Sequence, residues 1–130
     1  MLNKQRADAS NREIPVDVFQ GSDAVFEPEK KDPLSDRLNK DMFMNRKAQG
    51  WWNLRHRFLK TYRWVVDGVP CKPDEIISLS SKMALLQQLV TELSQPTWDD
   101  SASGKLLIEK APDGTKSPNL ADAVMIRFAP

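Results

Sequence analysis

The sequence has little of several features on which common classes of protein depend. Among its 130 residues there is one cysteine, Cys71, and one histidine, His56. A single cysteine excludes an internal disulfide and fits a reducing compartment, and a single histidine excludes histidine-based metal clusters and triads. No apolar run approaches the ~20 residues of a membrane-spanning helix, and the polar start lacks the apolar segment of a signal peptide. We therefore expect a soluble, cytoplasmic protein.

Charge of neither sign is in excess. The chain has 19 basic and 18 acidic residues, so its net charge of +1 indicates no partner by itself. The length suffices for one domain with its own hydrophobic core. We predict a polar N-terminal arm at residues 1–13 and a single domain at residues 14–130.

A helix at residues 41–66 gives the strongest periodic signal. Its apolar side chains share one broad face, and the following Asp67-Gly68 is typical of a helix C-terminus. Arg55 lies within that face, where its guanidinium has to extend to solvent or find an anionic partner. The aromatic residues could stack on nucleic-acid bases, but their helical spacing favours core packing. They are Trp51, Trp52, Phe58 and Tyr62.

The opposite face of this helix is basic and carries His56, Arg57, Lys60 and Arg63. Residues 42–66 include no acidic side chain that would neutralise it. Such a face could bind DNA phosphates with an affinity that falls with salt. The solvated side of an ordinary amphipathic helix has the same composition, and both interpretations stay open.

The other segments alternate between short elements and loops. Leucines at helical spacing, short apolar runs and the positions of proline and glycine predict their boundaries. The predicted order is a strand at 14–19, a long loop at 23–41, a helical turn at 73–79, a helix from 80 or 81 to 93, a loop at 98–104, a strand at 105–110 and a turn at 111–114.

The last segment is predicted to be a helix that is largely buried. Ser117 is a suitable N-cap, and Pro118 suits the first helical position because its missing N–H is not needed there. Asp122 lies on this helix, and a buried carboxylate is costly unless it is paired or binds a metal. A half-exposed Asp, or one paired with Lys or Arg, is the alternative. The apolar positions at helical spacing are Leu120, Val124 and Phe128.

The order of these segments carries a family resemblance. A tryptophan-bearing basic helix with Leu54-Arg55 precedes a leucine helix, a Gly-Lys-Leu-Leu-Ile-Glu strand and a tight turn. The sequence Ser-Pro-Asn-Leu-Ala-Asp-Ala follows. This order resembles the C-terminal part of the nuclease domain of tailed-phage terminase large subunits, whose last helix opens with Ser-Pro-Asp-x-Ala-Asp-Ala. The matching residues are Ser117, Pro118, Ala121, Asp122 and Ala123.

The resemblance implies a ribonuclease H-like α/β fold, here partial, with helices packed on a small incomplete sheet. It implies a metal-dependent endonuclease that cuts concatemeric viral DNA during genome packaging in the cytoplasm of the bacterial host. In that family Asp122 would be the third acid of a site for two Mg²⁺ or Mn²⁺ ions, which together promote phosphodiester hydrolysis. The implied partners are double-stranded phage DNA, the terminase small subunit and the portal, with no membrane.

The sequence also departs from the family pattern. Two further acids that the family carries on earlier strands do not occur, and neither does the phosphate-binding loop of its ATPase. Asn119 stands where the family often has Asp. We therefore interpret the chain as a piece of a terminase: a cloned fragment, half of a split gene or a prophage remnant. We expect it to bind metal weakly and cut poorly alone, since one carboxylate cannot fix two ions.

Basic residues near Asp122 complete the predicted site. In the resembling family such residues lie close to the nucleic acid, whereas a solvated hairpin is the alternative here. A non-catalytic DNA- or protein-binding module that uses the basic helix 45–66, or an inactive prophage remnant, is the competing function. The predicted DNA contacts are Arg57, Lys60, Arg63, Lys105, Lys110 and Lys116.

Overall fold

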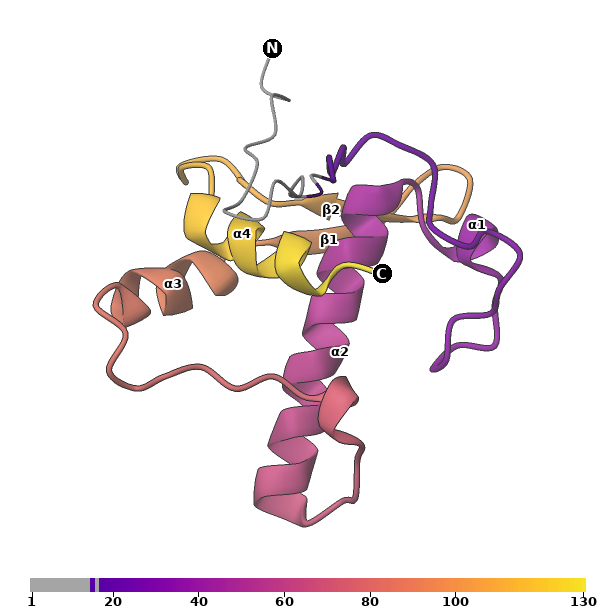
Figure 1. Cartoon of the computed structure of the whole chain (residues 1–130). Helices are drawn as coiled ribbons and strands as arrows, with labels where there is room; N and C mark the ends of the chain where they lie inside the picture. Colours follow the sequence, from indigo (N-terminus) through magenta and orange to yellow (C-terminus); the bar gives the residue numbers. More distant parts are fainter. Residues whose placement is uncertain (1–14, 16) are drawn as a thin grey trace.

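The computed structural model describes Pro15 and residues 17–130, and α2 is its longest element (Figure 1). The sheet, α3 and α4 gather around the N-terminal half of α2, and the C-terminal half of α2 extends away from them. In chain order the elements are α1 (Asn39–Met42), α2 (Arg46–Asp67), the 3₁₀ turn η1 (Pro73–Glu75), α3 (Leu86–Leu93), β1 (Thr97–Asp100), β2 (Leu106–Glu109) and α4 (Asn119–Phe128).

Both ends of α2 follow from local chemistry. The Asn45 side chain accepts a hydrogen bond from the Ala48 amide (3.0 Å) and so satisfies one of the free donors of the first turn. Gly68 ends the helix with φ of 69°, a left-handed conformation that glycine adopts without a steric penalty. The predicted C-terminal boundary is confirmed, and the helix begins a few residues later than predicted because Phe43 has extended backbone.

The sheet consists of β1 and β2, which pair antiparallel with Trp98 opposite Ile108. Leu106 and Ile108 are buried while the alternate residues of β2 are exposed, which is the period of a strand with one face on a core. The predicted strand at 105–110 is confirmed. The predicted loop at 98–104 is wrong in its first part, because residues 97–100 pair with β2. These residues show no alternation of apolar and polar side chains, and all four are exposed.

The hydrophobic core lies where α2, β2, α3 and α4 meet. Gly50 of α2 is central to it, because a Cβ at this position would lie 2.6 Å from the Met125 sulfur of α4. A side chain at residue 50 would therefore force the Met125 side chain out of its present position between the two helices. The buried apolar residues are Met42, Phe43, Ala48, Trp51, Leu54, Ile77, Leu89, Leu106, Ile108, Ala121 and Met125.

The aromatic residues of α2 divide along the helix. Trp51 is buried, and Trp52 and Phe58 pack against the core, so core packing is confirmed for these three. Tyr62 is 59% exposed, because the helix has left the core by that point. Arg55 is exposed, and its guanidinium lies 4.7 Å from the centre of the Trp52 ring, so it extends to solvent as expected.

Several predicted elements are shorter than the periodicity suggested. The helix after residue 80 begins only at Leu86, since residues 81–85 form turns, and Leu89 is its buried residue. The predicted helical turn at 73–79 is confined to η1, and the predicted loop at 23–41 is confirmed apart from α1 and an isolated bridge. The N-terminal arm lies outside the described residues. The predicted strand at 14–19 is wrong where it is described, because Pro15 and residues 17–19 have irregular backbone and pair with no other strand.

None of the helices described is both long enough and apolar enough to cross a membrane.

Candidate metal site

Asp122 lies in the first turn of α4. The N-terminus of this helix is not capped as the sequence suggested. The N-cap residue is Pro118, whose side chain makes no capping bond, and the Ser117 hydroxyl instead donates to the Asn119 side-chain oxygen (3.2 Å). The first intrahelical bond runs from the Asp122 amide to the Pro118 carbonyl (2.7 Å). The prediction of Ser117 as the N-cap is therefore wrong, because the helix starts one residue later.

Glu92 of α3 takes over this role from a distance of 28 residues in sequence. Its Oε1 accepts hydrogen bonds from the amides of Leu120 (2.8 Å) and Ala121 (3.3 Å), and Gln88 donates to Oε2 (2.9 Å). Desolvation alone would raise the pKa of Glu92, but the bonds from Gln88 and the two amides outweigh it and hold that pKa below 4.5. The sequence carries no local signal for a cap that comes from another helix.

The Asp122 carboxylate lies beside the Lys110 ammonium group, with 2.5 Å between Oδ2 and Nζ. The side chains of Asp122 and Lys110 are 19% and 33% exposed, so solvent reaches the pair. Within the described part of the chain, no hydrogen bond engages the second oxygen, Oδ1. The expectation of a paired Asp is confirmed, while α4 is less buried than predicted: only Ala121 and Met125 are buried, and Ile126 is exposed.

Of the two other lysines that were predicted near Asp122, Lys116 is held close to this pair and Lys105 is not. Gln95, just after α3, donates from Nε2 to the carbonyls of Lys110 (2.7 Å) and Lys116 (2.6 Å) and so draws these two residues together. Lys105 precedes the far end of β2, about 17 Å from Lys110 at the usual rise per strand residue.

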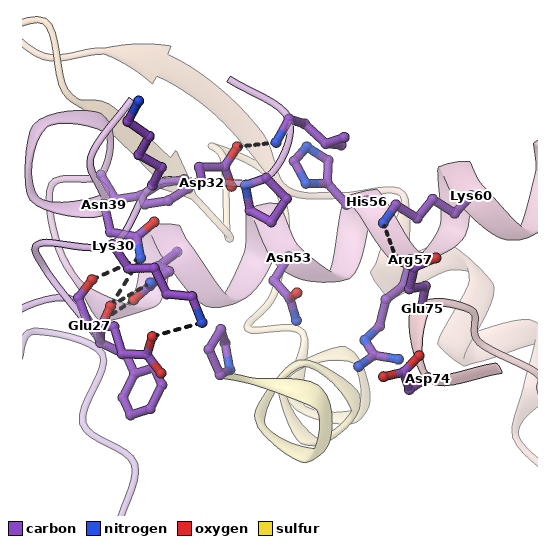
Figure 2. Close-up of a pocket in the computed structure, with 17 residues that line it drawn as sticks. Glu27, Lys30, Asp32, Asn39, Asn53, His56, Arg57, Lys60, Asp74 and Glu75 are labelled. Carbon is purple, nitrogen blue, oxygen red and sulfur yellow. Dashed lines mark hydrogen bonds and ion pairs between the residues drawn. The ribbon is translucent and has the colours of Figure 1, made fainter. Parts of the chain in front are cut away.

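Arg57 and Lys60 lie elsewhere, on a pocket of about 310 Å³ between the loop at 26–34, α2 and η1 (Figure 2). Arg57 donates to the Ile76 carbonyl (3.1 Å), and Lys60 lies 3.4 Å from Glu75. Arg63 is on the exposed end of α2. Pro130, which follows α4, lines the same pocket, so the pocket and Asp122 lie towards opposite ends of α4.

This pocket carries both signs of charge. Asp32 is buried there, and burial lowers the pKa of the neighbouring His56 below 6.5. The Asp32 charge opposes that lowering, while Arg55 and Lys60 reinforce it. A mixed pocket of this kind does not form the single basic track that the sequence suggested for His56, Arg57 and Lys60.

The site at α4 thus offers one accessible carboxylate oxygen next to a cation. Among Pro15 and residues 17–130, no group of three or more His, Cys, Asp or Glu side chains is placed to hold a metal ion. One carboxylate fits a divalent ion as a single ligand, since Mg²⁺ binds proteins through one or two carboxylates and keeps several waters. A pair of ions needs further acids from outside these residues.

No family model matches the chain, and no curated protein matches it. Solved structures do match. The nuclease domain of the large terminase subunit of bacterial virus Sf6 is 33% identical with a TM-score of 0.77, over 85% of this chain and 51% of that one. A lysine-to-alanine variant of that domain with manganese is 34% identical (TM-score 0.73), and the variant with calcium is 33% identical (TM-score 0.73), with the same coverage.

The chain therefore spans about half the length of the solved nuclease domains that it matches. The two-stranded sheet with helices packed on it agrees with the predicted partial ribonuclease H-like α/β fold. The resemblance predicted from the terminal motif is confirmed: this chain is similar to part of the nuclease domain of a phage terminase large subunit.

Proposed function

We propose that this chain is part of the endonuclease of a terminase large subunit, which cuts concatemeric viral DNA during genome packaging. The observation that carries the proposal is the placement of Asp122 in the first turn of α4, beside Lys110, in a chain about one third identical to solved terminase nuclease domains. The half of the domain that this chain does not span supplies the remaining acids. Alone, the chain cuts poorly.

Asp122 is the residue of this chain that would hold a metal ion, Mg²⁺ or Mn²⁺. The chemistry of a hard carboxylate oxygen fits both ions, and relatives of this fold have been solved with manganese and calcium. A pair of such ions, held by three acids, would supply the activation of water and the stabilisation of the leaving oxygen that phosphodiester hydrolysis needs. Asp122 would contribute Oδ1, which accepts no hydrogen bond within the described part of the chain. The packing of α4 against α2 and α3 holds the helix that carries it.

DNA contacts divide into two groups. Lys110 and Lys116 lie at the start of α4, where their charges can bind the phosphates next to the cleaved bond, and Lys105 extends this basic edge along β2. Arg57, Lys60 and Arg63 form a second group on α2. Arg57 and Lys60 lie on a pocket that acidic side chains also line, so we expect a smaller contribution from this group.

The partners and the location follow from the same proposal. The substrate is double-stranded phage DNA, the assembly includes the terminase small subunit and the portal, and the reaction takes place in the cytoplasm of the bacterial host.

The competing function is a non-catalytic module, or an inactive remnant, that binds DNA or protein through helix 45–66. The exposed C-terminal half of α2 favours it, because large apolar side chains face solvent there. They are Tyr62, Trp64, Val65 and Val66.

A cleavage assay separates the two functions. The chain is joined to the half of a solved terminase nuclease domain that it does not span, and supercoiled plasmid is incubated with this protein and Mn²⁺. We expect nicking and linearisation by the joined domain, a loss of at least about 100-fold in Asp122→Asn because a metal ligand is removed, and no loss in Asp113→Asn, an exposed acid of the adjacent turn. An inactive joined domain, or an Asp122→Asn variant that cuts normally, would contradict the nuclease function.

A further inference from the structure

The C-terminal end of α3 faces the segment that joins β2 to α4. Glu92 of this helix and Gln95, just after it, reach across to that segment. Glu92 accepts from the amides of Leu120 and Ala121, and Gln95 donates to the carbonyls of Lys110 and Lys116. No other side chain of α3 contacts this segment through a hydrogen bond in the described part of the chain.

α4 depends on Glu92 because its own sequence provides no cap. The first amides of a helix lack intrahelical acceptors and carry a partial positive charge. Pro118 has no side-chain acceptor, and Ser117 is hydrogen-bonded to Asn119 instead. A carboxylate at this end satisfies two donors at once and interacts favourably with the helix dipole.

Gln95 fixes the other part of the segment. A single side-chain NH₂ group donates to carbonyls six residues apart, at 2.7 Å to Lys110 and 2.6 Å to Lys116. The turn at 111–115 is thereby closed at its base. Lys110, just after β2, and Lys116, just before Ser117, are therefore both bound to the Gln95 side chain.

We propose that Glu92 and Gln95 are positioning residues that set the Lys110–Asp122 pair by clamping both ends of the β2–α4 segment to α3. Asp122 directly follows the two amides that Glu92 caps, and Lys110 itself carries one of the carbonyls that Gln95 binds. In this arrangement both carboxylate oxygens of Glu92 accept hydrogen bonds, Oε1 from α4 and Oε2 from Gln88. Only the consequence for metal binding rests on the proposed function.

The test compares four variants of the chain by NMR. Glu92→Ala removes the cap, Glu92→Gln keeps one acceptor oxygen without the charge, and Gln95→Ala removes the second contact. Gln87→Ala is the matched control, because it makes the same truncation at an exposed position of α3. The amide exchange rates of Leu120 and Ala121 and the ammonium signal of Lys110 are measured without metal.

We expect Glu92→Ala to speed exchange of the two amides about tenfold, the usual effect of losing an N-cap. Glu92→Gln should restore part of the protection, and Glu92→Ala and Gln95→Ala should both lose the protected Lys110 signal. The β1–β2 amides and Gln87→Ala should stay unchanged. Normal exchange and a normal Lys110 signal in Glu92→Ala and Gln95→Ala would overturn the proposal, as would equal effects in Gln87→Ala.

A second measurement separates the positioning role of Glu92 and Gln95 from the proposed metal binding at Asp122. In the parent chain, Mn²⁺ broadens the signals around Asp122 if that residue binds metal. The clamp variants should need several-fold more Mn²⁺ for equal broadening, because they loosen the backbone that carries Asp122 itself and not only its contact with Lys110. If the parent shows no broadening there while the metal-free effects are as expected, the metal function fails and the clamp stands. If Mn²⁺ broadens the parent and the clamp variants equally, the clamp does not position Asp122.

Discussion

The Lys110 ammonium group and the Asp122 carboxylate form an ion pair where β2 leads into α4. This pair places a cation beside the oxygen atoms that we assign to a metal ion. Lys110 therefore has two opposing effects: it holds the side chain of Asp122 and it repels a divalent cation. In the chain alone, which contributes a single acid at this site, we expect the repulsion to dominate.

Replacing Lys110 by Met should strengthen Mn²⁺ binding at Asp122. The Coulomb energy of two charges about 4 Å apart is ~1 kcal/mol in water and larger near a protein surface, so we expect the affinity to rise about fivefold or more. Isothermal titration calorimetry or NMR broadening measures it, with Lys116→Met as the control for net charge. Weaker binding in Lys110→Met would show instead that holding the carboxylate is the main role of Lys110.

Replacing Gly50 by Ala should destabilise the chain, although alanine is the better helix former by roughly 1 kcal/mol. The added Cβ would lie 2.6 Å from the Met125 sulfur, and overpacking of this kind costs about 1–3 kcal/mol. Urea unfolding followed by tryptophan fluorescence gives the free energy of unfolding.

The control compares the single variant Met125→Ala with the double variant Gly50→Ala/Met125→Ala, which gives the effect of Gly50→Ala without the Met125 side chain. Removing the sulfur makes room for the Cβ, so the effect of Gly50→Ala should largely vanish in the Met125→Ala background. Strictly additive effects would show that Gly50 and Met125 do not meet.

Stability should fall as the pH drops through 6.5, because the pKa of folded His56 is below that ordinary value. In this window the unfolded chain binds a proton that the folded chain does not, so the free energy of unfolding decreases with falling pH. Urea unfolding between about pH 7.5 and about pH 5.5 isolates His56, since the lowered carboxyl pKa values of Glu75 and Glu92 act below 4.5.

The control for this pH effect is His56→Gln, which has no titratable group at the position. Its stability should be nearly constant over the same range. An equal pH dependence in the variant would assign the effect to another group.

DNA binding should depend more on the lysines at α4 than on the basic residues of α2. We expect Lys116→Gln to weaken binding of a short duplex and to lower the slope of log affinity against log salt by about 1, as for one lost phosphate contact. Lys60→Gln is the matched control, because its ammonium group is already paired with Glu75. The reverse order, measured by fluorescence anisotropy, would place the DNA on helix 45–66 and favour the non-catalytic module.

The sequence predicts the elements that depend on local signals. The long helix α2, its end at Gly68, the strand β2 and the helix that carries Asp122 all have a periodic pattern or a terminal residue that marks them. The terminal motif carries the resemblance to terminase nucleases, and an Asp122 paired with Lys or Arg is one of the two interpretations that the sequence allows.

Features that depend on contacts distant in sequence could not be predicted in this way. β1 is a strand because β2 pairs with it, and α4 is capped by Glu92 of another helix rather than by Ser117. Arg57 and Lys60 share a helix face, but the loop at 26–34 and η1 turn that face into a pocket with acids of its own. Periodicity locates a face and cannot show what covers it.

The most direct test of the central claim is a Mn²⁺ titration of the chain followed by NMR line broadening, with Asp122→Asn as the control. If Asp122 is a metal ligand, the signals of Ala121, Ala123 and Lys110 broaden first in the parent chain and stay sharp in the variant. If those signals stay sharp while others broaden, or if the variant broadens like the parent, Asp122 does not bind the metal and the nuclease assignment of this site is wrong.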